Sequence, residues 1–192
     1  MKRTRTMAFG ALLLVLVLLV AGCTQPSGAP TTTVTPTATA TPQVTVPVTT
    51  PPADNETLKT EMMAMAETLA TTIDKQNLSA ALKEGENSTA FAAVLVQLQT
   101  FKADNPQVFY AYVLEQKNGT VVFIVTNYQG EPGAPLFMQE YLNPPEVLKT
   151  PVTGPIGIGP YTDEYGTFIS GFAPVDTGSN TSVILAGVDY QV

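Results

Sequence analysis

The fold is decided by the stretch VFYAYVLEQKNGTVVFIVTN, residues 108–127. Its two halves, residues 108–115 and 120–127, are rich in β-branched and aromatic residues, which favour strands. Asn118-Gly119 lies between them, and this pair is a strong hairpin signal because a type I′ turn needs positive φ at both central positions. We therefore predict a β-hairpin here. Both strands are apolar on both faces, so we expect a sheet that is covered on each side.

Upstream of the hairpin the spacing of apolar residues is helical. A first amphipathic helix is predicted over residues 56–75, with Asp54 or Asn55 as its N-cap. Its apolar stripe is formed by Leu58, Met62, Met65, Leu69 and Ile73. Residues 77–85 read as a short helical turn. A second helix is expected to begin at Ser88 and to end before Pro106, whose ring disfavours helix at the preceding residue.

Downstream of the hairpin, residues 128–160 hold many Gly and Pro. We expect an irregular segment there, with one short helical stretch at about residues 145–149. Two further strands are predicted at residues 167–175 and 182–190. Helices that precede antiparallel strands define an α+β class, so residues 54–192 are predicted to form a single α+β domain with N-terminal helices packed on the sheet.

The N-terminus has the organisation of an export signal. Lys2, Arg3 and Arg5 precede an uncharged apolar run over residues 7–21, which is too short to span a bilayer as a helix. Small residues then lead to Cys23, and this segment resembles the lipobox of lipoprotein precursors. The resemblance implies that residues 1–22 are removed and that a lipid on Cys23 anchors the chain to the outer face of the cell membrane. An ordinary secretory signal with an accidental cysteine is the alternative.

Residues 23–53 comprise Cys23 and a Thr/Pro-rich spacer without charge. Repeated Pro excludes a helix or a central strand, so we expect a disordered, extended linker between the lipid and the domain. A spacer of this kind after a lipobox resembles those of methanogenic archaea.

Composition excludes several function classes. After cleavage the chain would hold six Lys and sixteen Asp plus Glu, which leaves a formal charge of −10, and it would hold no Arg, His or Trp. Nucleic-acid binding is disfavoured because it needs clustered basic residues. Ser-His and Cys-His catalysis and a His/Cys zinc site are also disfavoured. The side chains of the adjacent pair Asp163-Glu164 would face opposite ways on a strand, which disfavours a joint acid/base role. From these observations together we expect no enzyme, no metal and no cofactor.

Five segments in order resemble the extracytoplasmic PAS-like sensor domains of the Cache family. FYAYVL (109–114) and NGTV (118–121) are similar to the first hairpin, GPYTDEYGT (159–167) to the segment entering the later strands, and FAPV (172–175) and AGVD (186–189) to the ends of the last two strands. The resemblance implies a long N-terminal helix on a roughly five-stranded antiparallel sheet. It also implies a small-molecule pocket on the opposite face, covered by residues 128–160.

The expected ligand-binding residues are Tyr110, Tyr112, Tyr161, Asp163, Tyr165 and Asp189. Tyr110 and Tyr112 would share one strand face because side chains alternate. The resemblance places the next three at the pocket rim, and it matches Asp189 to the acidic residue that takes a ligand's ammonium group in amino-acid-binding relatives. Simpler interpretations stay open: Tyr110 and Tyr112 would be core aromatics, and Tyr161 and Tyr165 would only cover the edge of the sheet. Asp163 would cap a turn, and Asp189 would be a solvated strand end.

One departure from the family changes the expected ligand. Amino-acid-binding members hold the ligand carboxylate with an Arg and flank it with Trp, and neither would remain here. We therefore expect an amine-type or neutral ligand, and a sensor-type lipoprotein that acts through a membrane partner such as a receptor or transporter, because no output module follows the last predicted strand. The alternative is a non-catalytic surface protein that keeps the scaffold for structure or interaction without a ligand.

Overall fold

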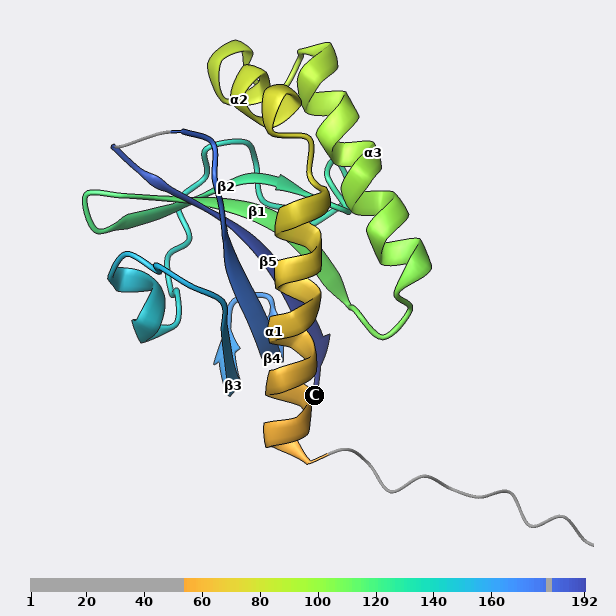
Figure 1. The fold of residues 1–192 in the computed structure, drawn as a ribbon, viewed down its shortest axis with the longest axis vertical. Coiled ribbons are helices and arrows are strands. Elements are labelled where there is room, and N and C mark those ends of the chain that lie inside the picture. Colours follow the sequence, from red (N-terminus) through yellow and green to blue (C-terminus); the bar gives the residue numbers. More distant parts are fainter. Residues whose placement is uncertain (1–53, 179–180) are drawn as a thin grey trace, which may run out of the picture. The chain divides into compact units, whose positions relative to one another are not determined.

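A computed structural model describes residues 54–178 and 181–192. The predicted signal peptide, the predicted lipidation site at Cys23 and the predicted spacer lie outside the described residues. Three helices, α1 (Asn55–Thr72), α2 (Lys75–Glu84) and α3 (Thr89–Asp104), precede the strands (Figure 1). The predicted α+β class is confirmed.

Five antiparallel strands form one sheet in the order β2-β1-β5-β4-β3. They are β1 (Tyr110–Lys117), β2 (Thr120–Thr126), β3 (Ile156–Asp163), β4 (Gly166–Val175) and β5 (Val183–Gln191). The hairpin is confirmed, since Asn118 and Gly119 have φ of 52° and 80°. The last strand, β5, lies at the centre of the sheet, where it joins the β1–β2 hairpin to the β3–β4 hairpin.

Helix α1 lies across one face of the sheet and packs on β3, β4 and β5 (Figure 1). It begins where the Asp54 side chain accepts a hydrogen bond from the Thr57 amide at 2.8 Å, and Met62, the centre of the predicted stripe, is fully buried. The helix backbone approaches β4 so closely that a Cβ added to Gly171 would lie 1.9 Å from the Met62 carbonyl oxygen. Only glycine permits this contact.

Helices α2 and α3 pack on each other, and α3 also contacts β1 and β2. The prediction of a mere helical turn over residues 77–85 was wrong, because α2 has ten residues. The Asp74 side chain caps it by accepting from two backbone amides at 2.9 and 3.0 Å, and it ends at Gly85, whose φ is 84°. Ser88 caps the N-terminus of α3, at the position where the sequence predicts this helix to begin.

Strand β3 corrects the expectation that residues 128–160 are irregular throughout. Gly157, Gly159 and Pro160 obscured the strand pattern, since both residue types are rare in strand interiors. They are tolerated because β3 is an edge strand whose register shifts between Ile158 and Tyr161. The rest of the segment contains the short 3-10 helix η1 (Glu146–Lys149), which agrees with the helical stretch predicted there.

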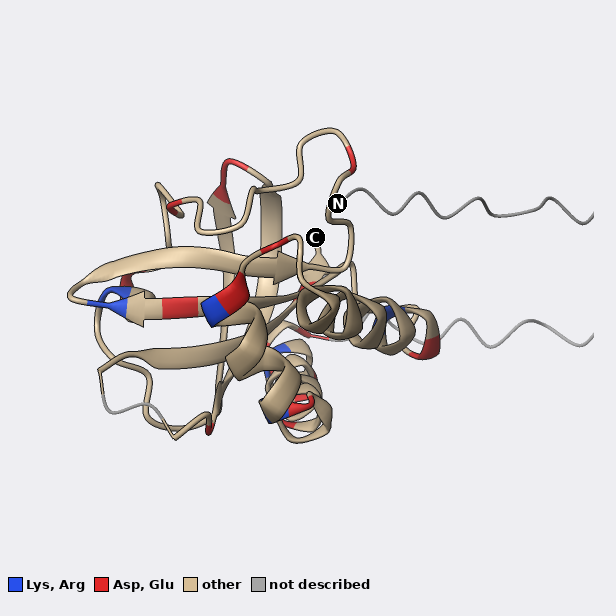
Figure 2. Ribbon diagram, turned by 90° about the horizontal axis from the view of Figure 1, so that it is seen from above, with Lys and Arg blue, Asp and Glu red and all other residues tan. Residues whose placement is uncertain are grey.

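The two faces of the sheet each bury a hydrophobic core, as the two-sided apolar pattern predicted. Met62, Val94 and Ile169 belong to the core under the helices, whereas Leu148 and Phe172 belong to the core on the opposite face. Most charged residues lie on helices, turns and strand ends (Figure 2), and Glu115 of β1 and Asp189 of β5 are exceptions within the sheet.

Tyr141, Leu148 and Val152, from the segment between β2 and β3, cover the second face. The buried Gln116 side chain on β1 fastens this cover by donating to the carbonyls of Leu148 and Thr150 at 2.6 and 3.0 Å and accepting from the Val152 amide at 3.0 Å. The candidate functional site lies on this face of the sheet, next to the segment that Gln116 holds.

Candidate functional site

Strands β1 and β5 bring the predicted Tyr110, Tyr112 and Asp189 onto one face of the sheet. Tyr110 is paired with Asp189, and Tyr112 with Gly187. A Cβ at Gly187 would lie 2.3 Å from the Tyr112 ring. The absence of a side chain at Gly187 therefore leaves room for the Tyr112 ring against β5, where its hydroxyl reaches the Asp189 carboxyl group.

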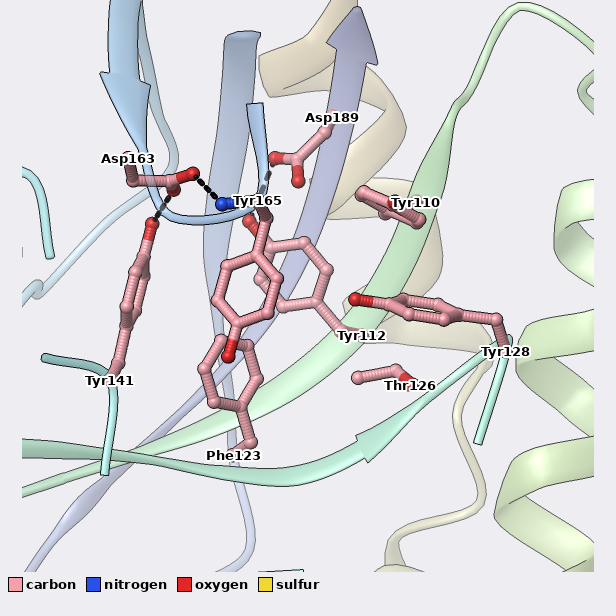
Figure 3. A pocket seen from close by; sticks show the side chains of 9 residues that line it. All are labelled: Tyr110, Tyr112, Phe123, Thr126, Tyr128, Tyr141, Asp163, Tyr165 and Asp189. Atoms are coloured by element: carbon pink, nitrogen blue, oxygen red, sulfur yellow. Dashed lines mark hydrogen bonds between the residues drawn. The ribbon is translucent and has the colours of Figure 1, made fainter. Parts of the chain in front are cut away.

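The Asp189 carboxyl group is buried, with 5% of the residue exposed. Its Oδ1 accepts hydrogen bonds from the Tyr112 hydroxyl at 2.8 Å and from Ser170 Oγ at 2.6 Å. Tyr161 lies one step further away, with its hydroxyl 2.9 Å from Ser170 Oγ. In Figure 3 the second oxygen of Asp189 points toward the space between the aromatic rings.

Burial is the main electrostatic influence on Asp189. It raises the pKa of this carboxyl to about 7, the negative charge of Asp163 acts in the same direction, and the hydrogen bonds from Ser170 and Tyr112 oppose the shift. Among the residues that the structure describes, no Lys lines the pocket. An ionised Asp189 therefore lacks a protein cation, and a buried charge without a partner is costly.

Aromatic side chains surround this carboxyl group (Figure 3). The pocket is lined by Tyr110, Tyr112, Phe123, Thr126, Tyr128, Tyr141, Asp163, Tyr165 and Asp189. The Tyr110 and Tyr128 rings stack with centroids 4.4 Å apart, and the Phe123 ring lies 5.0 Å from Tyr141 and 5.4 Å from Tyr165. Burial raises the pKa of the Tyr112 and Tyr141 hydroxyls, so both stay protonated and donate hydrogen bonds.

Asp163 is a turn cap that also lines the pocket. Its Oδ1 accepts from the backbone amides of Tyr165 and Gly166 at 2.8 and 3.1 Å, and its Oδ2 accepts from the Tyr141 hydroxyl. Both oxygens thus have partners within the fold. Asp163 fixes the β3–β4 turn and thereby positions the Tyr165 ring at the pocket, while its charge adds to the negative potential there.

The structure brings together five of the six predicted site residues at one pocket. Tyr161 is the exception: it does not line the pocket and reaches Asp189 only through Ser170. The interpretation of Asp189 as a solvated strand end is wrong, since the side chain is buried. Tyr112 is buried too, so it is a core aromatic and a pocket residue at once.

Four lining residues were not predicted: Phe123, Thr126, Tyr128 and Tyr141. Phe123 and Thr126 are three positions apart, so simple alternation places them on opposite faces of β2. A shift in register between β1 and β2 puts one extra residue on β2, and both side chains then face the pocket. Tyr128 and Tyr141 belong to the segment that was expected to cover the pocket, but no local signal singled them out.

Thr126 differs from the other lining residues in the hydrogen bonding of its side chain. It is 1% exposed, and its Oγ1 has no hydrogen-bond partner within the described part of the chain. The space enclosed between the rings is about 10 Å³, which suffices for about one water molecule. A larger ligand requires the partly exposed Tyr128 and Tyr165 rings to move.

Residues 54–178 and 181–192 contain no group of His, Cys, Asp and Glu side chains arranged to hold a metal ion. Nor does any helix within these ranges have the length and apolar content to cross a membrane.

Comparisons of the chain with protein-family models, with curated proteins and with solved structures each gave no match.

Proposed function

We propose that this domain binds a small organic amine in its protonated form, with Asp189 as the counter-ion of the ammonium group. The observation that carries the proposal is a buried carboxyl group that faces a ring of aromatic side chains and has no Lys beside it. A ligand cation would supply the missing partner for this charge.

The aromatic lining supports a cationic ligand independently of Asp189. The faces of Tyr and Phe rings carry negative potential and attract ammonium groups within about 6 Å of the ring centroid. Tyr110, Tyr112 and Tyr165 all lie next to the space that Asp189 faces (Figure 3). Residues 54–192 contain sixteen carboxylates and six lysines, and this acidic surface would also attract a cation.

Amino acids fit this pocket less well than amines. Their carboxylate would need a positive partner, and among the described residues no lysine contributes to the lining. It would also lie close to Asp163 and Asp189, and the repulsion between like charges costs binding energy. The ligand is therefore an amine without a carboxylate.

The proposed setting is the outer face of a membrane, with the domain held by a lipid on Cys23. A lipid inserted in one leaflet cannot transmit a conformational change across the bilayer, so an amine sensor of this kind would act through a membrane partner, either a receptor or a transporter. The α+β fold, with α1 on one face of a five-stranded sheet and the pocket on the other, agrees with the architecture that the PAS-like resemblance implies.

A thermal-shift screen of the full chain tests the proposal. Simple alkylamines and amino alcohols should raise the melting temperature in proportion to the logarithm of their concentration. Amino acids and short organic acids should have smaller effects. Asp189→Asn should abolish the shift, whereas Asp104→Asn, which removes an exposed carboxylate on α3, should not. Absence of stabilisation by any amine would contradict the proposal.

A second candidate function is a non-catalytic structural or interaction protein that keeps the scaffold without a ligand. The small size of the enclosed space, about 10 Å³, favours this alternative. Cross-linking on intact cells would distinguish the two: a stoichiometric envelope partner whose yield is unaffected by amines supports the structural role, and an amine-dependent yield supports the sensor.

A further inference from the structure

The unpartnered hydroxyl of Thr126 lies in the same pocket as Asp189. Buried polar side chains nearly always have a hydrogen-bond partner, so each exception calls for an explanation. Thr126 Oγ1 has none among the described residues, and the side chain lines the pocket. Asp189 and Thr126 lie at opposite ends of the group of rings in Figure 3.

We propose that the ligand is a bifunctional amine, which carries a neutral hydrogen-bonding group such as a hydroxyl that pairs with Thr126 while its ammonium group pairs with Asp189. This inference rests on the proposed function and defines the chemical class of the ligand. A threonine hydroxyl can donate one hydrogen bond and accept others, so it can pair with a ligand hydroxyl that acts either as acceptor or as donor.

The sheet register gives the approximate length of such a ligand. Thr126 pairs with Tyr112 on β1, Tyr112 pairs with Gly187 on β5, and Asp189 is two residues further along β5. Strand spacing and rise then place the Cα atoms of Thr126 and Asp189 about 12 Å apart. Both side chains face the pocket and leave the sheet on the same side, so their polar atoms are separated by roughly the same distance. A hydrogen bond of about 2.9 Å at each end leaves about 6 Å between the two ligand groups, which a chain of three or four carbons spans.

The second ligand group is expected to be neutral. The lining residues nearest to Thr126 in the sequence are Phe123 and Tyr128, and its cross-strand partner is Tyr112. None of the three offers a carboxylate or a basic group. A second ammonium group would therefore be desolvated without a counter-ion, and a carboxylate would meet no cation, both of which are unfavourable. A hydroxyl, in contrast, forms a hydrogen bond that Thr126 otherwise lacks.

Isothermal titration of the full chain with matched ligand pairs tests this inference. The pairs are 3-aminopropanol against n-butylamine and 4-aminobutanol against n-pentylamine, in which a methyl group replaces the hydroxyl. The wild-type protein should prefer the amino alcohol by at least about tenfold, since one buried hydrogen bond has about this effect. Thr126→Val has the same shape without the hydroxyl and should remove the preference while leaving alkylamine affinity in place.

Two controls separate the role of the hydroxyl from general effects on the sheet. Thr126→Ser keeps a hydroxyl and should keep the preference. Thr120→Val, at an exposed position on β2, should behave as wild type. Equal affinity for both members of each pair, or an unchanged preference in Thr126→Val, would overturn the inference while amine binding stands. If no amine binds to the wild-type protein at all, the proposed function fails and this inference fails with it.

Discussion

Replacing Asp189 by Asn should make the protein more stable at alkaline pH, although the residue forms two buried hydrogen bonds. Asn is nearly isosteric, and its carbonyl oxygen can still accept from Tyr112 and Ser170. It carries no charge, so it avoids the cost of ionising a carboxyl group without water. The substitution thus separates the free-energy cost of the buried charge from the contribution of side-chain packing.

The magnitude follows from the shift in pKa. The Asp189 pKa rises from 3.8 to about 7 in the folded state. Between these values the folded protein holds a proton that the unfolded chain has lost, so stability falls as pH rises, by about 1.4 kcal/mol per pH unit. The full loss of wild-type stability is about 4 kcal/mol. It is complete above pH 7 and absent below pH 4. The stability of Asp189→Asn relative to wild type should rise by this amount across the window.

Denaturant unfolding of both proteins at several values of pH between 4 and 8 measures this difference. Circular dichroism is the suitable signal, because the chain has no Trp. Asp104→Asn, an exposed carboxylate at the end of α3, controls for the change in net charge. A difference between wild type and Asp189→Asn that stays constant over the whole range would refute the reasoning.

Three further outcomes follow. Amine affinity should fall about tenfold per pH unit below about 7, with release of one proton, because the ammonium group pairs with ionised Asp189; titration in buffers of different ionisation enthalpy measures this. Gly171→Ala should destabilise the fold by about 3 kcal/mol, seen as a lower melting temperature, since its Cβ would collide with the Met62 carbonyl. Gln116→Leu should cost about 2 kcal/mol and increase amide exchange at Val152, whose partner it removes.

Local sequence signals predicted much of the fold. Asn118-Gly119 located the hairpin because its turn geometry requires these residue types, and Asp54 and Ser88 located helix starts because their side chains satisfy free amides. Strand β3 escaped prediction because its Gly and Pro are compatible with an edge position that only the neighbouring strands define.

The site was predictable where it depends on strand alternation and less so where it depends on long-range contacts. Tyr110 and Tyr112 share a face by periodicity alone. The register shift that turns Thr126 toward the pocket arises from pairing between strands. Similarly, the burial of Asp189 depends on Ser170 of β4 and on the cover over the second face, which have no signature near residue 189.

A crystal structure of the protein with its most stabilising amine would test the central claim most directly. The ligand nitrogen should lie within about 3 Å of an Asp189 carboxylate oxygen, with the rings of Tyr110, Tyr112 and Tyr165 around it. An amine bound elsewhere, with only water between these rings, would contradict the assignment of this pocket as the binding site.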